Sequence, residues 1–523
     1  MAHRSIHFFN HFTVLASAAA LIGALGCGDD DSDDGSDGGR GGSAGSGAQA
    51  GRPNGGASGS GGSGGSTAGM TGESGSGGGD SEAAELRVVH AAPGAPAVDL
   101  YAKGSTTPFA KALAYGEATD YVELPVGTYQ VEVRAAGADA DEDPAFTTPA
   151  ISVDAGKRYT AIAAGDLSST DKSDAFRVLP LEEGFDAAGN DETTVRVVHA
   201  GFDAPAVDIN VGNDGGTPEV EGLERFADTG AAGVALPAAT ELQIGIEVDG
   251  DVVTAFTTPE LAEGAEVFVI ATGQLGRLAR EDEGFSLLAV LPDGTTAFIR
   301  QNPRVYALHA SPDAGAVDIF AGDAELVDSA RFGDLAGIQV PPGAYDLDFF
   351  GAEAGASDRP TGDPAATAAT PELEAGQSYL AIAAGELTAT TPTFGLIPVV
   401  EGFEIEEDGA RVRVIHASAD APEVDLGTVT TTGDIDTPPL LSELEFEDVS
   451  DAEGLAVPAA ALRLGLSASG STATAAEFEL TTTDGLRAFV VAAGAFSGGA
   501  NGFRLFVIDT TATPWAIAAV QPE

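Results

Sequence analysis

The sequence predicts an all-β protein built from four tandem β-sandwich domains, antiparallel and immunoglobulin-like, that follow a disordered tether. The first observation is a stretch of 13 residues that occurs four times, at intervals of 109, 110 and 107 residues. A period of this length indicates an array of whole domains, because solenoid repeats are much shorter. The second observation is that each interval contains about seven short apolar segments between Gly-, Pro-, Asp- and Thr-rich turns, with no credible helix.

Residues 1–26 have the features of a secretory signal peptide. Arg4 and three His residues form a weakly cationic start, and a short apolar segment follows. The run 23–27 resembles a bacterial lipobox, in which the Cys thiol receives diacylglycerol, with Ala24 where that motif usually has Leu. Cys27, the single Cys of the chain, is therefore the predicted lipidation site. The alternative is an ordinary signal peptide with an incidental Cys.

Residues 27–85 are predicted to form the disordered tether. Six Asp residues between positions 29 and 37 repel one another, and Gly/Ser tracts with almost no apolar side chains follow them. A flexible coil of this length has an average span of about 40–45 Å.

From residue 86 onward the pattern changes to short strands, and we place the sandwich domains at 86–192, 193–302, 303–409 and 410–523. In the first domain we expect strands at 86–90, 98–101, 121–124, 129–134, 150–153, 159–164 and 176–179. The same order of segments recurs in every domain. The linkers between domains are short, so we expect neighbouring domains to touch.

The recurring stretch begins Arg-Val-Val-His-Ala in its first copy and ends in an Asp nine residues after the His. Because the His ends one strand and the Asp lies in the next, we expect a hydrogen bond between them that closes the intervening loop. A metal site is the alternative, but one His and one Asp are too few ligands for a zinc site unless domains combine. The four pairs are His90 and Asp99, His199 and Asp208, His309 and Asp318, and His416 and Asp425.

The same stretch, V-V-H-A-x-P-x-A-P-A-V-D, resembles the opening signature of the bacterial family called domain of unknown function 4397. The resemblance extends over nearly all of the chain from residue 86 to the C-terminus. It implies tandem extracytoplasmic domains with a β-sandwich fold, often carried by lipoproteins. It implies no established activity.

The sequence matches known catalytic and metal-binding motifs poorly. Ser311 and Ser418 follow their His by two residues, but Ala92 and Gly201 occupy this position in the other copies, and no G-x-S-x-G segment is present. The acidic run 139–143 alternates oxygen ligands like a calcium loop, yet it lacks the Gly and the Glu that such a loop requires. We therefore expect a protein that is not an enzyme and that has neither a cofactor nor a metal.

Three tyrosines of the first domain are an alternative binding feature. Tyr101, Tyr121 and Tyr129 are of the residue type that forms sugar-binding platforms. Tyrosines on strands more often pack across the sheet, which is the interpretation we favour.

The charge of the chain limits its partners. The net charge is −57, from 81 acidic and 24 basic residues, so nucleic acids and anionic membrane surfaces would be repelled. After Cys27 no stretch of 18 apolar residues occurs, and no transmembrane helix is expected. The expected partners are a membrane, reached through the lipid anchor, and an unknown protein or polysaccharide ligand.

The four copies fall into two alternating types. The first and third share a Gly-x-Tyr segment at 127–129 and 343–345, whereas the second and fourth share Pro-Ala-Ala at 237–239 and 458–460. We predict an array of the form A-B-A-B in which the A and B faces complement each other. Duplication without any contact is the alternative.

These observations lead us to expect an exported, non-catalytic lipoprotein of the cell envelope. It would be anchored in the outer membrane and face the surface or the periplasm, where its domains would serve adhesion, spacing or binding. The alternative function is that of a carbohydrate- or calcium-dependent matrix-binding protein.

Overall fold

The computed structural model describes residues 83–352, 358–388, 392–405 and 408–523. Within these residues every regular element is a strand, and the strands form four sandwich-like units, so the predicted all-β fold is confirmed. No helix that could cross a membrane occurs in this part of the chain. The predicted signal peptide, the predicted lipidation site Cys27 and the predicted tether up to residue 82 lie outside the described residues.

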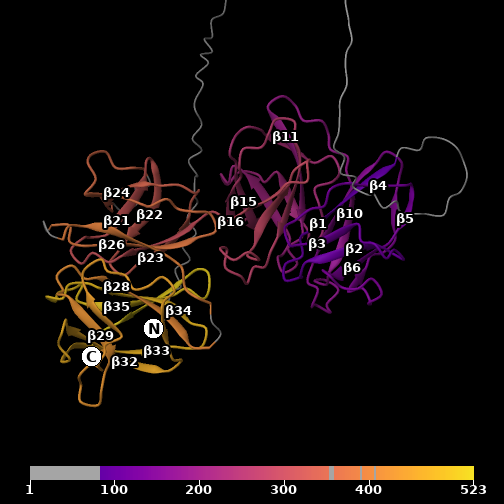
Figure 1. Cartoon of the computed structure of the whole chain (residues 1–523). Coiled ribbons are helices and arrows are strands. Elements are labelled where there is room, and N and C mark those ends of the chain that lie inside the picture. Colours follow the sequence, from indigo (N-terminus) through magenta and orange to yellow (C-terminus); the bar gives the residue numbers. More distant parts are fainter. Residues whose placement is uncertain (1–82, 353–357, 389–391, 406–407) are drawn as a thin grey trace, which may run out of the picture. The chain divides into compact units, whose positions relative to one another are not determined.

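The first unit contains strands β1 to β10 (Figure 1). Its most completely buried strands are β1 and β9. Its main sheets have the orders β10-β9-β1-β4 and β3-β2-β6-β7, and β5 pairs with β8. The strands are β1 (Ala84–His90), β2 (Val98–Ala102), β3 (Ala110–Leu113), β4 (Val122–Leu124), β5 (Gly127–Tyr129), β6 (Val131–Ala135), β7 (Phe146–Thr147), β8 (Ile151–Val153), β9 (Arg158–Ala164) and β10 (Arg177–Glu182).

The second unit has sheets of order β14-β11-β17-β18-β19 and β13-β12-β15-β16. Its strands are β11 (Glu192–His199), β12 (Val207–Val211), β13 (Val220–Leu223), β14 (Val234–Pro237), β15 (Gln243–Val248), β16 (Asp251–Thr257), β17 (Glu266–Thr272), β18 (Ser286–Val290) and β19 (Thr296–Ile299).

The third unit has sheets of order β23-β20-β26-β27 and β22-β21-β24-β25. Its strands are β20 (Arg304–His309), β21 (Val317–Ala321), β22 (Ala324–Ala330), β23 (Leu335–Gln339), β24 (Asp346–Gly351), β25 (Ala366–Ala369), β26 (Ser378–Ala384) and β27 (Gly395–Val400).

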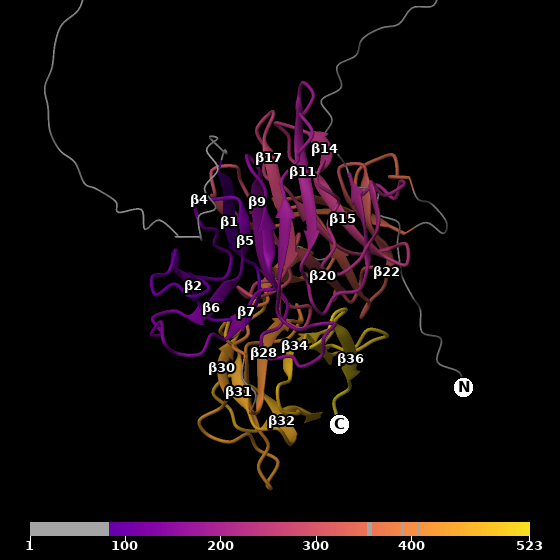
Figure 2. The same cartoon turned by 90° about the vertical axis from the view of Figure 1, so that its right-hand side faces the viewer.

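The fourth unit repeats the arrangement of the second, with sheets of order β31-β28-β34-β35-β36 and β30-β29-β32-β33 (Figure 2). Its strands are β28 (Ala410–Ala417), β29 (Val424–Thr428), β30 (Leu441–Leu444), β31 (Leu455–Val457), β32 (Ala461–Ala468), β33 (Thr474–Thr481), β34 (Arg487–Ala493), β35 (Arg504–Asp509) and β36 (Ala516–Val520). The alternation of two unit types is therefore visible in the sheets, because only the second and fourth units add a fifth strand, within the described residues.

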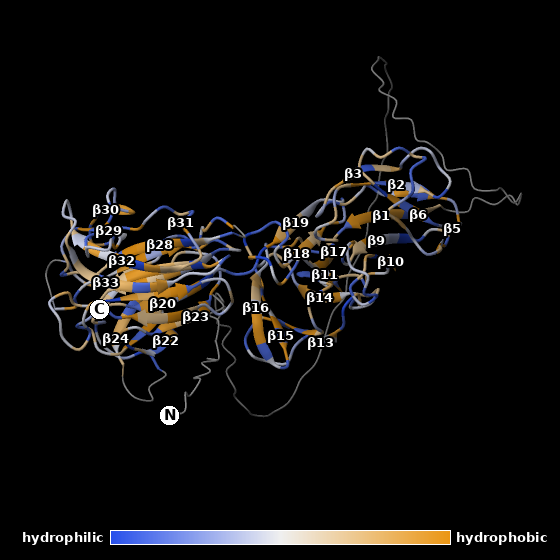
Figure 3. Ribbon diagram, turned by 90° about the horizontal axis from the view of Figure 1, so that it is seen from below, coloured by the Kyte–Doolittle hydropathy of each residue, from blue (hydrophilic) through white to orange (hydrophobic). Residues whose placement is uncertain are grey.

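The sheets are mixed, and the expectation of purely antiparallel sheets is wrong. β1 pairs in parallel with β9, from Glu85 opposite Arg158 to His90 opposite Ala163. Equivalent parallel pairs are β11–β17, β20–β26 and β28–β34. Parallel strands are typically buried on both faces, and most residues of β1, β9, β11 and β17 are buried accordingly. Figure 3 shows the apolar colour along β1 and β9.

Each of these central sheets is apolar on both faces. Val88 and His90 of β1 face the inside of the first sandwich, where they line a small apolar cavity. The alternate residue Val89 belongs to a different core, which it shares with Val198 and Phe268 of the second unit. The first and second units therefore pack sheet on sheet, and we call them the first pair.

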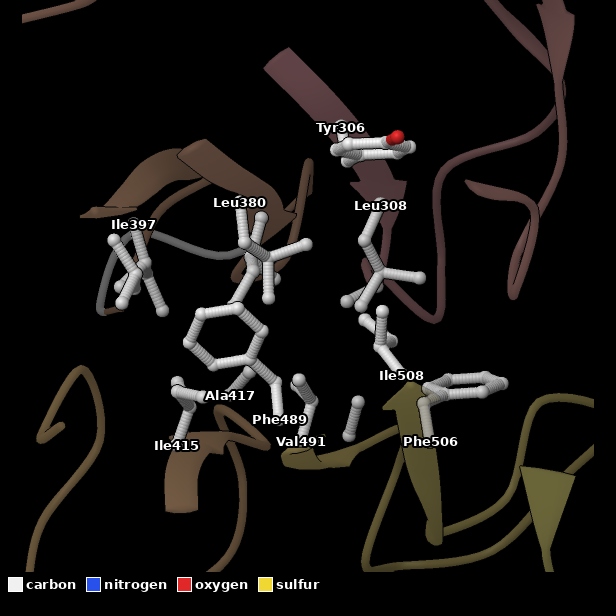
Figure 4. Packing of buried hydrophobic residues seen from close by; sticks show 14 of the residues in the cluster. Tyr306, Leu308, Leu380, Ile397, Ile415, Ala417, Phe489, Val491, Phe506 and Ile508 are labelled. Carbon is white, nitrogen blue, oxygen red and sulfur yellow. The ribbon is translucent and has the colours of Figure 1, made fainter. Parts of the chain in front are cut away.

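The third and fourth units form a second pair with the same geometry. Leu308, Ile382 and Ala384 of the third unit share one core with Phe489 and Val491 of the fourth. In Figure 4 the side chains of the two units point toward each other from facing ribbons. Leu308 and Ile382 occupy the positions of Val89 and Ile162 in the first pair. The predicted contact between A and B faces is confirmed for both pairs.

Candidate functional site

The recurring stretch is the natural place to look for a functional site, because four His residues share one position in it. All four side chains are buried, with 1–3% of each residue exposed. Three of them line apolar cavities inside their sandwiches, with volumes of about 20, 70 and 40 Å³ for the first, second and third units. Cavities of this size and polarity are packing voids, since a bound water needs several polar partners.

The His side chains do not bond to the Asp side chains, so the expected His–Asp hydrogen bond is wrong. Nε2 of His90 lies 3.3 Å from the carbonyl oxygen of Pro96, six residues on. The equivalent distances are 2.8 Å for His199, 2.9 Å for His309 and 3.4 Å for His416. The ring therefore closes the loop by donating to a backbone carbonyl, and it does so as a neutral group. Burial lowers the pKa of all four His residues.

Each Asp of the motif holds a bulge in the neighbouring edge strand. Asp99 accepts the backbone N–H of Ala112 at 2.8 Å, and Ala112 is left-handed with φ of 50°. The pairing of β2 with β3 shifts register at this point. A left-handed residue other than Gly is strained, so a carboxylate that fixes its N–H stabilises the bulge. The other three Asp residues bond to left-handed Gly222, Ser329 and Glu443 in the same way.

A second Asp, four residues after the His, was not singled out from the sequence. Asp420 accepts the N–H groups of Phe496 and Ser497 at 2.6 and 2.8 Å. Asp313 and Asp203 bond to the equivalent loops, whereas Gly94 takes this place in the first unit. An Asp occurs four residues after the His in three of the four copies, and this recurrence is the sequence signal that would have identified the position.

These three loops, and the equivalent loop of the first unit, which no such Asp holds, each present one large apolar side chain to solvent. We call these side chains the loop tips. They are exposed by 40%, 51%, 37% and 44%, and they are Leu167, Leu275, Leu387 and Phe496. Each follows the strand parallel to its His strand. Hydrogen bonds from Thr272 to the Ala91 carbonyl (2.7 Å) and from Asn501 to the Pro312 carbonyl (2.9 Å) join these strand ends across the pairs, so the two tips of a pair lie at the same end of the strands.

The residue three positions before the His joins the two units of a pair. Arg87 is 2% exposed and donates to the carbonyl oxygen of Leu291 in the second unit at 2.9 Å. Arg196 reciprocates by donating to the carbonyl oxygen of Glu182 at 2.7 Å. In the second pair Arg413 donates to Val400, at 2.5 Å from its carbonyl oxygen. The polar residues of the motif are thus used for structure.

The remaining candidate side chains are also engaged. Tyr101 is 4% exposed, and the hydroxyls of Tyr121 and Tyr129 donate to Glu183 and to the Pro125 carbonyl, so the three do not form a platform. The Ser418 hydroxyl donates to the carbonyl oxygen of Gly494 at 2.6 Å and makes no hydrogen bond to His416. The Ser418 hydroxyl is therefore bonded to the backbone and not to the His ring.

One group of carboxylates in the described residues has the spacing of a cation site. Oxygens of Asp318, Glu325 and Asp328 lie within 4.8 Å of one another. Burial and the nearby Asp328 and Asp318 raise the pKa of Glu325. Asp318 is the bulge-holding Asp of the third unit, so the group arises where β22 passes beside it. Acids of the run 139–143 are exposed and belong to a separate loop.

Sequence comparison matches two segments of the chain to a known family. Residues 84–210 and 303–427 match the family described as Domain of unknown function (DUF4397). The chain carries two copies of DUF4397. Each copy begins with the first unit of a pair and ends in the second strand of the following unit, β12 or β29. The DUF4397 copies thus recur once per pair. No curated protein matches the chain.

Proposed function

We propose that this protein is a non-catalytic lipoprotein of the cell envelope that displays two paired β-sandwich modules for adhesion. The observation that carries the proposal is the set of four loop tips. Nearly half of the large exposed apolar residues in the described chain occupy this one position of the repeat. Exposed apolar residues that are scattered over a surface need no explanation. An exposed Leu or Phe at the same position of all four repeats requires one.

The loops that carry the tips are held in place before any partner arrives. The carboxylate of Asp420 fixes two successive N–H groups, and that of Asp313 fixes the N–H groups of Leu387 and Thr388. An apolar side chain on a rigid loop loses little entropy on binding, which favours attachment. The polar groups of the motif serve the backbone, and this supports a role without catalysis.

The envelope location rests on the N-terminal sequence. Cys27 lies in a lipobox-like context, and the acidic Gly/Ser-rich segment after it has the composition of a flexible tether. A tether of this length would hold the modules some tens of ångströms from a membrane. Replacing Cys27 by Ala should move the protein from the membrane fraction to the soluble fraction, and retention in the membrane would contradict the anchor.

Adhesion is tested by removing the tips on cells that display the full chain. A variant with Ser at Leu167, Leu275, Leu387 and Phe496 should attach less to protein- and polysaccharide-coated surfaces at equal surface expression. The matched control replaces Val252 and Val253, which are 41% and 49% exposed on β16 away from the loop tips. Equal attachment of tip variant, control and parent would reject the proposal.

A further inference from the structure

An open cleft lies at the junction of the first and second units. Its volume is about 540 Å³, several times that of the cavities inside the sandwiches. One wall is formed by β3, β4 and the turn between them in the first unit. The other wall is the hairpin that joins β18 and β19 in the second unit. Ligand clefts of several hundred Å³ are common at domain interfaces.

The cleft is held open by the shared core of the first pair. Phe298 of β19 packs against Tyr115 of the first unit, with ring centroids 5.4 Å apart. It also lies over Gly116, where an added Cβ would come within 2.5 Å of the Phe298 ring. Because the hairpin is fixed on this side, its turn stands beside the cleft as a rigid wall. The site is therefore formed before a ligand binds.

The lining combines an aromatic ring with hydroxyl, carboxylate and ammonium groups. Such a set can accept and donate hydrogen bonds around a polyhydroxylated ring while an apolar surface contacts its C–H face. Lys111, Asp120 and Thr295 are exposed, so their polar atoms are available to a ligand in the cleft. The residues that supply these groups are Phe109, Lys111, Glu117, Asp120, Thr295 and Thr296.

We propose that this cleft binds a neutral saccharide unit of an extracellular polysaccharide. The inference rests on the proposed binding role of the chain and names a ligand class for it. Charge selects against anionic sugars, because two carboxylates and one ammonium group line the cleft and the chain has a net charge of −57. The apolar lining, with Phe109, Leu113 and Val122, favours a ring with C–H faces over a small polycation.

The test is calorimetric titration of the full chain, purified in detergent, with neutral disaccharides such as maltose and cellobiose. A glucuronic-acid disaccharide and spermidine serve as the anionic and cationic comparators. Two variants address the cleft, namely the double substitution Lys111→Ala with Asp120→Asn, and Thr296→Trp, which fills it. The matched control is Lys103→Ala with Asp139→Asn, which makes the same charge changes at exposed positions of the same unit outside the cleft.

A neutral disaccharide should bind the parent and the control equally. It should bind the double variant about tenfold or more weakly, as expected for lost hydrogen bonds to charged groups, and the Thr296→Trp variant at least as weakly, because the indole occupies the cleft. Unchanged thermal unfolding of the variants will show that they are folded. Equal binding by parent and cleft variants, preference for a charged comparator, or no binding of any disaccharide would overturn the proposal. If saccharides fail to bind while the tip variant still loses attachment, this inference fails and the proposed adhesion stands.

Discussion

Trp515 stacks on Tyr306, with ring centroids 4.0 Å apart and planes inclined by 8°. The two residues belong to the fourth and third units, and the Tyr306 hydroxyl accepts the backbone N–H of Trp515 at 3.2 Å. Trp515 is 8% exposed and is the single Trp of the chain. Its fluorescence is therefore a direct report on the docking of the second pair.

Truncation of Tyr306 should loosen the second pair. Tyr306→Ala removes the stacked ring and leaves a cavity in the shared core, which should cost about 3–5 kcal/mol of stability. The emission of Trp515 should shift to longer wavelength as water reaches the indole. Tyr129→Ala, in the first unit, is the control and should leave the emission unchanged. An unshifted Tyr306→Ala spectrum would mean that the stack does not hold the units together.

Loss of a bulge-holding Asp should destabilise its own sandwich. Asp425 accepts the N–H groups of Glu443 and Gly470 at 2.8 and 3.0 Å. Asp425→Ala leaves both donors without this partner and should lower the free energy of unfolding by about 1.5–3 kcal/mol. Hydrogen exchange at the amide of Glu443 should accelerate selectively. Asp484→Ala, in a loop of the same unit, is a control at an Asp outside the bulge.

The buried His residues should make stability depend on pH. Burial lowers the pKa of His309 below 6.5, despite opposing contributions from the Gly315 carbonyl and Asp334. The unfolded chain then binds the proton more readily. The stabilising contribution of the neutral ring is complete above pH 6.5 and is lost as the pH falls toward the folded-state pKa.

His309→Gln removes this titration. Above pH 6.5 the variant should be less stable than the parent by about 1–3 kcal/mol, because a buried hydrogen bond is altered. The difference should shrink as the pH is lowered to about 5, where carboxylates are still mostly ionised. Urea unfolding followed by Trp515 fluorescence measures both values. A difference that stays constant over this range would contradict the role given to the ring.

The pair should behave as the unit of folding. A fragment of residues 84–191 exposes Val89, Ile162 and the rest of its half of the shared core, and it should aggregate or self-associate. A fragment of residues 84–302 retains both halves and should unfold in a single transition as a monomer. Ultracentrifugation and calorimetry distinguish the two. A stable monomer of the shorter fragment would show that the shared core is dispensable.

The sequence was sufficient to predict the strands with clear boundaries, and it could not reveal which strands pair. The run 159–164 has no period-two polarity because both of its faces are buried, so the parallel partner of β1 was hidden. β3 was missed because Ala110 and Lys111 carry little apolar signal, and the strand depends on Asp99 from β2. Recurrence identified His90 and Asp99 as important, but hydrogen-bond partners in the backbone leave no trace in the side-chain pattern.

The fifth strand of the second unit decides where the chain leaves the first pair. In the first unit, β1 begins and β10 ends at the same end of the strands, since Glu85 lies opposite Arg158 and Glu182 lies opposite Tyr159. In the second unit, β19 turns back and ends with Ile299 opposite Leu287, at the other end of the strands.

Tension applied to the chain would therefore enter the pair at one end of its strands and leave it at the other. The Arg87–Leu291 and Thr272–Ala91 bonds show that the two sheets are aligned in the same direction, so the load runs along both of them. Force along a strand is shared by all of its lateral hydrogen bonds, whereas force across a strand end breaks them one at a time. The β18–β19 hairpin thus gives the first pair a shearing geometry under tension, which resists extension better than an unzipping one.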